Sequence, residues 1–115
     1  MSERTPLTTA HFRALRFRKI TDGVKYREVH LSNLMLCYYE LEPDTRHSGT
    51  ATEERIVFVS EGDVTGSVGE VPFAVSHGEA ILIGAGEPFI WHATSRTRLV
   101  EARGSTDPKS IIALD

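Results

Sequence analysis

Short apolar runs separated by turn-forming residues recur along this 115-residue chain, and this rhythm constrains the fold most strongly. The runs are rich in β-branched and aromatic residues, and turn formers such as Pro43-Asp44, Gly62 and Gly84 interrupt them. Strands with turns about every eight to twelve residues are typical of all-β sandwiches and barrels. We therefore predict strands over residues 31–42, 55–62, 79–86, 89–94 and 97–104.

Only residues 8–19 suggest a helix, which Thr8 or Thr9 would cap, but their apolar side chains form no clean helical stripe. The chain length fits one domain with its own hydrophobic core. We expect a single domain over residues 1–115. Residues 1–10 and 108–115 are expected to be loosely held arms, or strands that pair with a second subunit.

Composition narrows the classes of function. Apolar residues make up 40% of the chain and charged residues 25%, as in ordinary globular proteins. The net charge of −3 argues against nucleic acid as a partner. Basic residues gather near the N-terminus, in HFRALRFRK, where we expect a solvated surface strand or a partner-facing arm, with an anion-binding patch as the alternative.

The single cysteine, Cys37, lies in an apolar run and is expected to be a buried, inert thiol. No disulfide can form within the chain, which is typical of a reducing compartment. No signal peptide is visible and no apolar stretch is long enough to span a membrane. We expect a cytoplasmic protein with no membrane partner.

Residues 78–89, GEAILIGAGEPF, carry a spacing that points to a known family. Gly78 is followed by five residues, Gly84, one residue, Gly86, two residues and Phe89. This stretch resembles the second motif of the cupins, small double-sheet barrels of the jelly-roll type, with the form G(x)5PxG(x)2H(x)3N. In this register, Phe89 takes the position of the metal-binding histidine.

Residues 40–62 resemble the first cupin motif, G(x)5HxH(x)3,4E(x)6G, in their order of strand, turn, loop and strand. Counting back from Gly62 places Arg55 at the glutamate position. The histidine positions fall on Gly49 and Ala51, or on Ser48 and Thr50. A one-residue β-bulge would bring Glu54 to the glutamate position without supplying the histidines. The family's metal ligands therefore do not carry over, and we predict no cofactor.

In the predicted strand over residues 89–94, the sequence indicates which side chains point to the same face of the sheet. Side chains alternate between the two faces of a strand, so Phe89 and Trp91 share one face and His92 takes the other. If Phe89 points into the barrel, as the family's histidine does, Phe89 and Trp91 form an apolar wall for a ligand. The alternative is that both rings simply fill the core of a small barrel.

Arg55 shares a strand face with Val57 and Val59, which suggests that its guanidinium points inward. Burying that charge is costly unless a carboxylate or an anionic ligand pairs with it. Arg55 could hold a substrate carboxylate or stabilise an enolate-like oxyanion. Alternatively, it lies at the surface or pairs with Glu53 or Glu54.

His47 and Glu54 lie in the loop where cupins place their chemistry, and a histidine with a carboxylate can transfer protons near neutral pH. If a metal is bound, we expect His47, Glu54 and His92 as ligands, although the alternation of the strand opposes an inward His92.

Tyr38 and Tyr39 are adjacent, so only one of them faces the interior. We name Tyr38 as a substrate-binding phenol.

Together these features predict an all-β, cupin-type jelly-roll barrel that binds a small apolar or anionic organic molecule. The resemblance implies a homodimer, formed through an outer sheet or an exchanged N-terminal strand. We favour a metal-independent isomerase, cyclase or lyase, with His47, Glu54 and Arg55 as catalytic residues. The alternatives are a metal-dependent, dioxygenase-like cupin with relocated ligands and a non-catalytic ligand-binding barrel.

Overall fold

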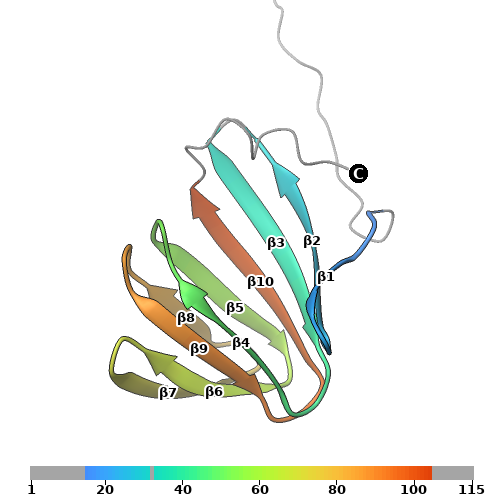
Figure 1. The fold of residues 1–115 in the computed structure, drawn as a ribbon, viewed down its shortest axis with the longest axis vertical. Coiled ribbons are helices and arrows are strands. Elements are labelled where there is room, and N and C mark those ends of the chain that lie inside the picture. Colours follow the sequence, from blue (N-terminus) through green and yellow to red (C-terminus); the bar gives the residue numbers. More distant parts are fainter. Residues whose placement is uncertain (1–14, 32, 105–115) are drawn as a thin grey trace, which may run out of the picture.

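Two antiparallel β-sheets face each other and make up the fold (Figure 1). The computed structural model describes residues 15–31 and 33–104. The larger sheet contains, in spatial order, β1 (Arg18–Thr21), β2 (Val24–His30), β3 (Leu34–Leu41), β10 (Thr97–Gly104), β5 (Arg55–Glu61) and β8 (Ala80–Ile83). The smaller sheet contains β4 (Thr45–Thr50), β9 (Pro88–Ala93), β6 (Asp63–Val68) and β7 (Val71–Ser76).

The prediction of an all-β jelly-roll barrel is confirmed. The five predicted strands correspond to β3, β5, β8, β9 and β10, with ends that differ by a few residues. The described residues contain no helix, and none of their elements could cross a membrane as an apolar helix. The helix considered over residues 8–19 is wrong for its last part, because Arg18 and Lys19 begin β1. Residues 1–14 and 105–115, which include both predicted arms, lie outside the described residues.

Sequence analysis missed five strands, β1, β2, β4, β6 and β7, and for two of them the reason lies in their composition. β4 (TRHSGT) and β6 (DVTGSV) contain few large apolar residues and carry glycine, so they lack a strong strand signal. Both strands pair with β9, which lies between β4 and β6 in the smaller sheet. Pairing with β9, which is distant in the sequence, therefore stabilises β4 and β6 more than their own composition does.

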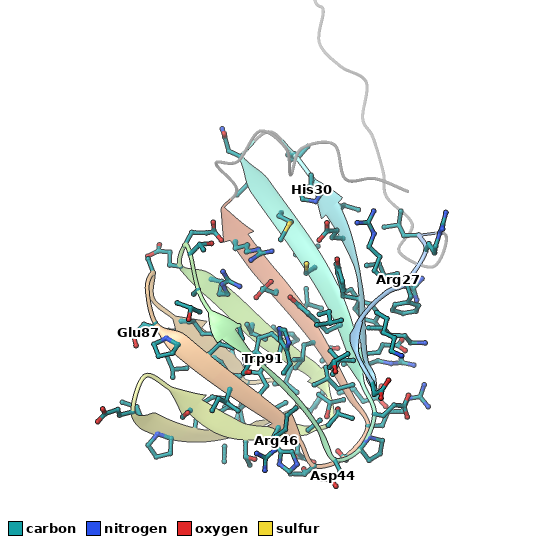
Figure 2. The ribbon with its side chains drawn as sticks, in the orientation of Figure 1. Arg27, His30, Asp44, Arg46, Glu87 and Trp91 are labelled. Carbon is teal, nitrogen blue, oxygen red and sulfur yellow. The ribbon has the colours of Figure 1, made fainter. Side chains whose placement is uncertain are left out.

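The hydrophobic core lies between the inner faces of the two sheets. Alternate residues of each strand point inward, so in β3 Met35, Cys37, Tyr39 and Leu41 are buried. Figure 2 shows Trp91 of β9 in the space between the sheets. Trp91 is fully buried and is the largest such side chain.

Cross-strand register arranges the inner face of the larger sheet into layers. One layer places Tyr26, Tyr39, Leu99 and Val59 side by side on β2, β3, β10 and β5. The next layer contains Glu28, Cys37, Glu101 and Val57, and the one after it His30, Met35, Arg103 and Arg55. The barrel interior is therefore apolar at one end of these strands and charged at the end where His30 lies (Figure 2).

Candidate functional site

A cavity of about 290 Å³ lies between the two sheets, where the apolar and charged layers meet. Its lining comes from β1 to β5, β9 and β10 and consists of Ile20, Tyr26, Glu28, Cys37, Tyr39, His47, Ser48, Gly49, Thr50, Arg55, Phe89 and Arg103. Two larger hollows adjoin β8 and have mostly apolar linings. We place the candidate site in the smaller cavity because it brings a histidine, carboxylates, guanidiniums and phenols together.

The predicted faces of β9 are confirmed. Phe89 and Trp91 point inward and are buried, whereas His92 lies on the other face and bonds to Asp44 at 2.9 Å. Phe89 borders the cavity, and Trp91 stacks behind it with ring centroids 5.2 Å apart. Phe89 therefore supplies the apolar wall, while Trp91 fills the core and supports it.

His47 on β4 is the titratable side chain that the aromatic wall surrounds. It lies opposite Trp91 in the β4–β9 pairing, and its ring centroid is 5.0 Å from Trp91, 5.8 Å from Phe89 and 6.0 Å from Tyr39. Burial, and then the nearby Arg55 guanidinium, lower the pKa of His47 below its ordinary value. The imidazole is therefore neutral at pH 7 and able to accept a proton.

Arg55 points inward, on the strand face that it shares with Val57 and Val59. It is buried and pairs with two carboxylates, Glu101 at 3.3 Å and Glu53 at 3.2 Å. Its Nε also donates to the Glu53 backbone carbonyl at 3.4 Å. One of the two partners considered from the sequence, Glu53, is thus correct, and the other partner comes from a distant strand.

Glu101 on β10 was not identified from the sequence, although it lies at the centre of the charged layers. It is fully buried, accepts a hydrogen bond from Tyr39 Oη at 3.1 Å and lies 3.7 Å from Arg103 Nε. Burial, followed by the Glu101 charge, raises the pKa of Tyr39 well above its ordinary value, so this phenol stays protonated. A glutamate inside the pattern TRLVEARG at an inward position was the available signal.

A second carboxylate, Glu28 on β2, extends this polar layer. Cys37 Sγ donates to Glu28 at 3.6 Å, and His30 Nε2 contacts the same carboxylate at 3.1 Å. Burial, together with nearby carboxylates, raises the pKa of the Cys37 thiol to about 12. The prediction of a buried, unreactive thiol agrees with this environment.

Glu54, predicted as a catalytic carboxylate, does not reach the cavity. Its side chain is exposed and borders the hollow formed with Leu34, Ile56 and Leu82, whose side chains are exposed on the outer face of the larger sheet. The neighbouring Glu53 is the residue that contacts Arg55. The bend between β4 and β5 directs Glu53 toward Arg55 and leaves Glu54 exposed, and strand alternation does not determine the directions of side chains in a bend.

Tyr38, predicted to bind substrate, also lies outside. It hydrogen-bonds to Glu40 at 3.2 Å and lies beside Phe17 on the outer face of the larger sheet. Tyr39 is the one that faces the cavity. We therefore correct the assignment and place Tyr39, not Tyr38, in the candidate site.

The metal-ligand set considered from the sequence is not brought together. His47 lies in the cavity, Glu54 on the outer face, and His92 beside Asp44. Within residues 15–31 and 33–104, no cluster of three or more His, Cys, Asp or Glu side chains could hold a metal ion. At the cupin ligand positions, Gly49 lies opposite Phe89 and Arg55 pairs with carboxylates, so these side chains do not fit a metal.

Comparison with solved structures agrees with this architecture. An RmlC-like cupin from Shewanella frigidimarina matches with a TM-score of 0.78 and 12% identity, over 86% of this chain and 91% of that one. KdgF from Halomonas sp. matches with a TM-score of 0.78 and 12% identity, over 90% and 99% of the two chains. The chain has the cupin fold.

The polyketide cyclase RemF from Streptomyces resistomycificus is also similar, with a TM-score of 0.75 and 17% identity over 89% of this chain and 81% of that one. No family model matches the sequence, and no match is found among curated proteins. At these identities, the likeness extends to the fold and not to the chemistry of the site.

Proposed function

We propose that this protein is a metal-independent cupin-fold enzyme, an isomerase, cyclase or lyase that acts on a small organic substrate in the cavity. The observation that carries the proposal is His47, a neutral imidazole that lines a cavity also containing Arg55, Arg103 and Tyr39. A base beside guanidiniums is an arrangement suited to removing a proton from a carbon atom next to a carbonyl group.

In the proposed step, His47 takes a proton from a carbon atom adjacent to a substrate carbonyl. The C–H bond breaks, its electron pair moves toward the carbonyl oxygen, and the imidazole becomes an imidazolium. The guanidiniums stabilise the negative oxygen, while Tyr39, which lines the cavity, donates its hydroxyl proton to Glu101. Return of the proton to another carbon completes an isomerisation, whereas loss of a leaving group or attack on a second carbonyl completes a lyase or cyclase reaction.

Three features support this reading. Phe89 offers an apolar surface to the body of a substrate, and the cavity volume suits a small ligand. The residues at the cupin ligand positions do not fit a metal, which favours acid–base chemistry by side chains. A cyclase, RemF, is among the similar structures, which lends support by analogy of fold alone.

The test is exchange of carbon-bound hydrogen with solvent, because exchange reports proton abstraction whatever product follows. A panel of cyclic diketones, 2-oxo acids and phenols is incubated with the protein in deuterated water and followed by NMR. We expect deuterium incorporation that His47→Gln reduces by about 100-fold or more. His92→Gln, on the outer face, is the matched control and should retain full exchange.

The pH dependence gives a second readout of the same step. Because the pKa of His47 is lowered below 6.5, activity should be retained at pH 7 and be lost only as the pH falls below 6.5 through this lowered pKa. Exchange that persists in His47→Gln would contradict the assignment of the base. Tight binding of panel members without exchange would instead identify a non-catalytic ligand-binding barrel.

A further inference from the structure

Two guanidiniums lie on adjacent strands at the charged end of the cavity. Arg55 and Arg103 are cross-strand partners on β5 and β10, and both line the cavity. Their carboxylate partners, Glu101 and Glu53, differ sharply in accessibility. The Glu101 side chain is fully buried, whereas that of Glu53 is 33% exposed.

Glu53 contacts both guanidiniums through a single oxygen atom. Its Oε1 accepts a hydrogen bond from Arg55 at 3.2 Å and from Thr52 Oγ1 at 2.8 Å, and it lies 3.6 Å from Arg103. Glu53 belongs to the short connection between β4 and β5, outside the strand ladders. It is therefore an accessible carboxylate on a loop that bridges two cationic side chains.

Arg103 has weaker partners than Arg55. Its contacts with Glu53 and Glu101 measure 3.6 and 3.7 Å, beyond the usual range for a hydrogen bond to oxygen. A further donor lies 3.7 Å from the thioether sulfur of Met35, which is a weak acceptor. Arg103 thus retains donor capacity at the cavity that a better-placed carboxylate could use.

We propose that Arg55 and Arg103 form a binding site for a small monocarboxylate, and that Glu53 occupies this site in the ligand-free protein. The inference rests on the proposed function, since it names the class of substrate for the same cavity. Glu101 is buried and fixed, whereas Glu53 can turn toward solvent and give up its place. A ligand carboxylate then replaces a carboxylate of the same charge, so the site stays neutral.

The surroundings define the rest of the ligand. The Arg55 guanidinium carbon lies 5.7 Å from the centre of the Phe89 ring, so a charge held there adjoins an apolar wall. His47 lies against the same ring. A monocarboxylate with a compact, apolar or aromatic body would therefore place its carboxylate on the guanidiniums and its body against Phe89 and His47.

The experiment is an NMR titration with benzoate that follows the arginine Nε–Hε signals. We expect Glu53→Gln to bind benzoate about tenfold more tightly than the unmodified protein, because the internal competitor loses its charge. Glu54→Gln removes the neighbouring exposed carboxylate and is the matched control. It should bind benzoate as the unmodified protein does.

Two further comparisons establish that the guanidiniums bind the carboxylate. Adding Arg103→Gln to Glu53→Gln should remove the gain in affinity, and Arg103→Lys should restore part of it. Benzamide, which has the same shape without the charge, should bind at least about tenfold more weakly than benzoate. Binding to Glu53→Gln no tighter than to the unmodified protein, absence of benzoate binding, or equal binding of benzamide would each overturn the proposal.

The outcome is separable from that of the proposed function. His47→Gln leaves both arginines and Glu53 in place, so adding Glu53→Gln to this variant should still tighten benzoate binding about tenfold. If benzoate binds as expected but no substrate exchanges hydrogen, the carboxylate site stands and the proton-transfer step is wrong. If hydrogen exchange occurs but Glu53→Gln binds benzoate no more tightly than the unmodified protein, the proton-transfer step stands and the carboxylate site is wrong.

Discussion

Glu101 shows how one residue organises the candidate site. It is buried on β10 and contacts Tyr39, Arg55 and Arg103, which reach it from three different strands. A buried charge on Arg55 required a partner, as the sequence indicated, but the sequence did not identify Glu101 as that partner. Their separation is 46 residues, and only the pairing of β5 with β10 brings them together.

At this scale we predict that Glu101→Leu destabilises the fold by about 3 to 5 kcal/mol, because it leaves the Arg55 guanidinium buried without its main partner. The double variant Arg55→Met with Glu101→Leu should recover much of that loss. Denaturant unfolding of Glu101→Leu, Arg55→Met and the double variant measures the free energies of unfolding.

The matched control for this cycle is Glu61→Gln. Glu61 also pairs with an arginine, Arg98, but this pair is solvent-exposed, so its loss should cost less than about 1 kcal/mol. If the losses in the double variant simply added, Glu101 and Arg55 would not be coupled.

Among the elements, β6 is packed closely against the backbone of its neighbour β9. Gly66 lies at its centre, opposite Trp91 of β9. A Cβ atom at this position would collide with the backbone carbonyl of Ile90 and approach the Phe73 ring. The glycine that weakens the strand signal in the sequence is therefore the residue that allows β9 to approach closely.

We predict that Gly66→Ala destabilises the protein by about 2 kcal/mol, because the backbone of β9 has to shift away from β6. Gly84→Ala is the control, since a Cβ there makes only an ordinary contact with the Glu87 side chain. Thermal unfolding compares the two variants. Equal melting temperatures would show that the smaller sheet accommodates the added methyl group.

For the whole molecule, the outer face of the larger sheet is unusually apolar. Leu34, Ile56, Phe58 and Leu82 on β3, β5 and β8 are between 41% and 71% exposed. Register aligns them into two rows, Leu36–Ala102–Ile56–Leu82 and Tyr38–Val100–Phe58–Ala80, which cross β3, β10, β5 and β8 without a charged side chain. Extended apolar faces of this kind are typical of protein interfaces.

We propose that a second copy of the chain covers this face and forms the homodimer expected from the sequence. Two such faces related by a two-fold axis would pack apolar rows against each other, as the layers of a β-sandwich do. The exposed apolar rows support the outer-sheet route, whereas residues 1–10, the arm expected to pair with a second subunit, lie outside the described residues.

We predict that Leu82→Glu, on the edge strand β8, converts the dimer to a monomer without unfolding it. Light scattering after size-exclusion chromatography gives the mass. Ile90→Glu is the control, because Ile90 is 44% exposed on β9 of the other sheet and should leave the dimer intact. A monomeric unmodified protein at micromolar concentration would contradict the proposal.

The sequence by itself determined the all-β class, five of the strands and the faces of β9, including the outward His92. These features follow from turn residues and from the two-residue period of a strand, both of which are local. It also selected His47, Phe89 and Arg55, which line the cavity, although His47 lies on strand β4 and not in a loop.

Only the tertiary structure decided which polar groups meet. The choice of Tyr39 over Tyr38 depended on a shift of one residue, which reverses the face of every side chain in a strand. The choice of Glu53 over Glu54 depended on the bend between β4 and β5. The meeting of Glu101 with Arg55 depended on the register between strands far apart in the sequence. Local periodicity carries no information on that register, because the packing of two complete sheets sets it.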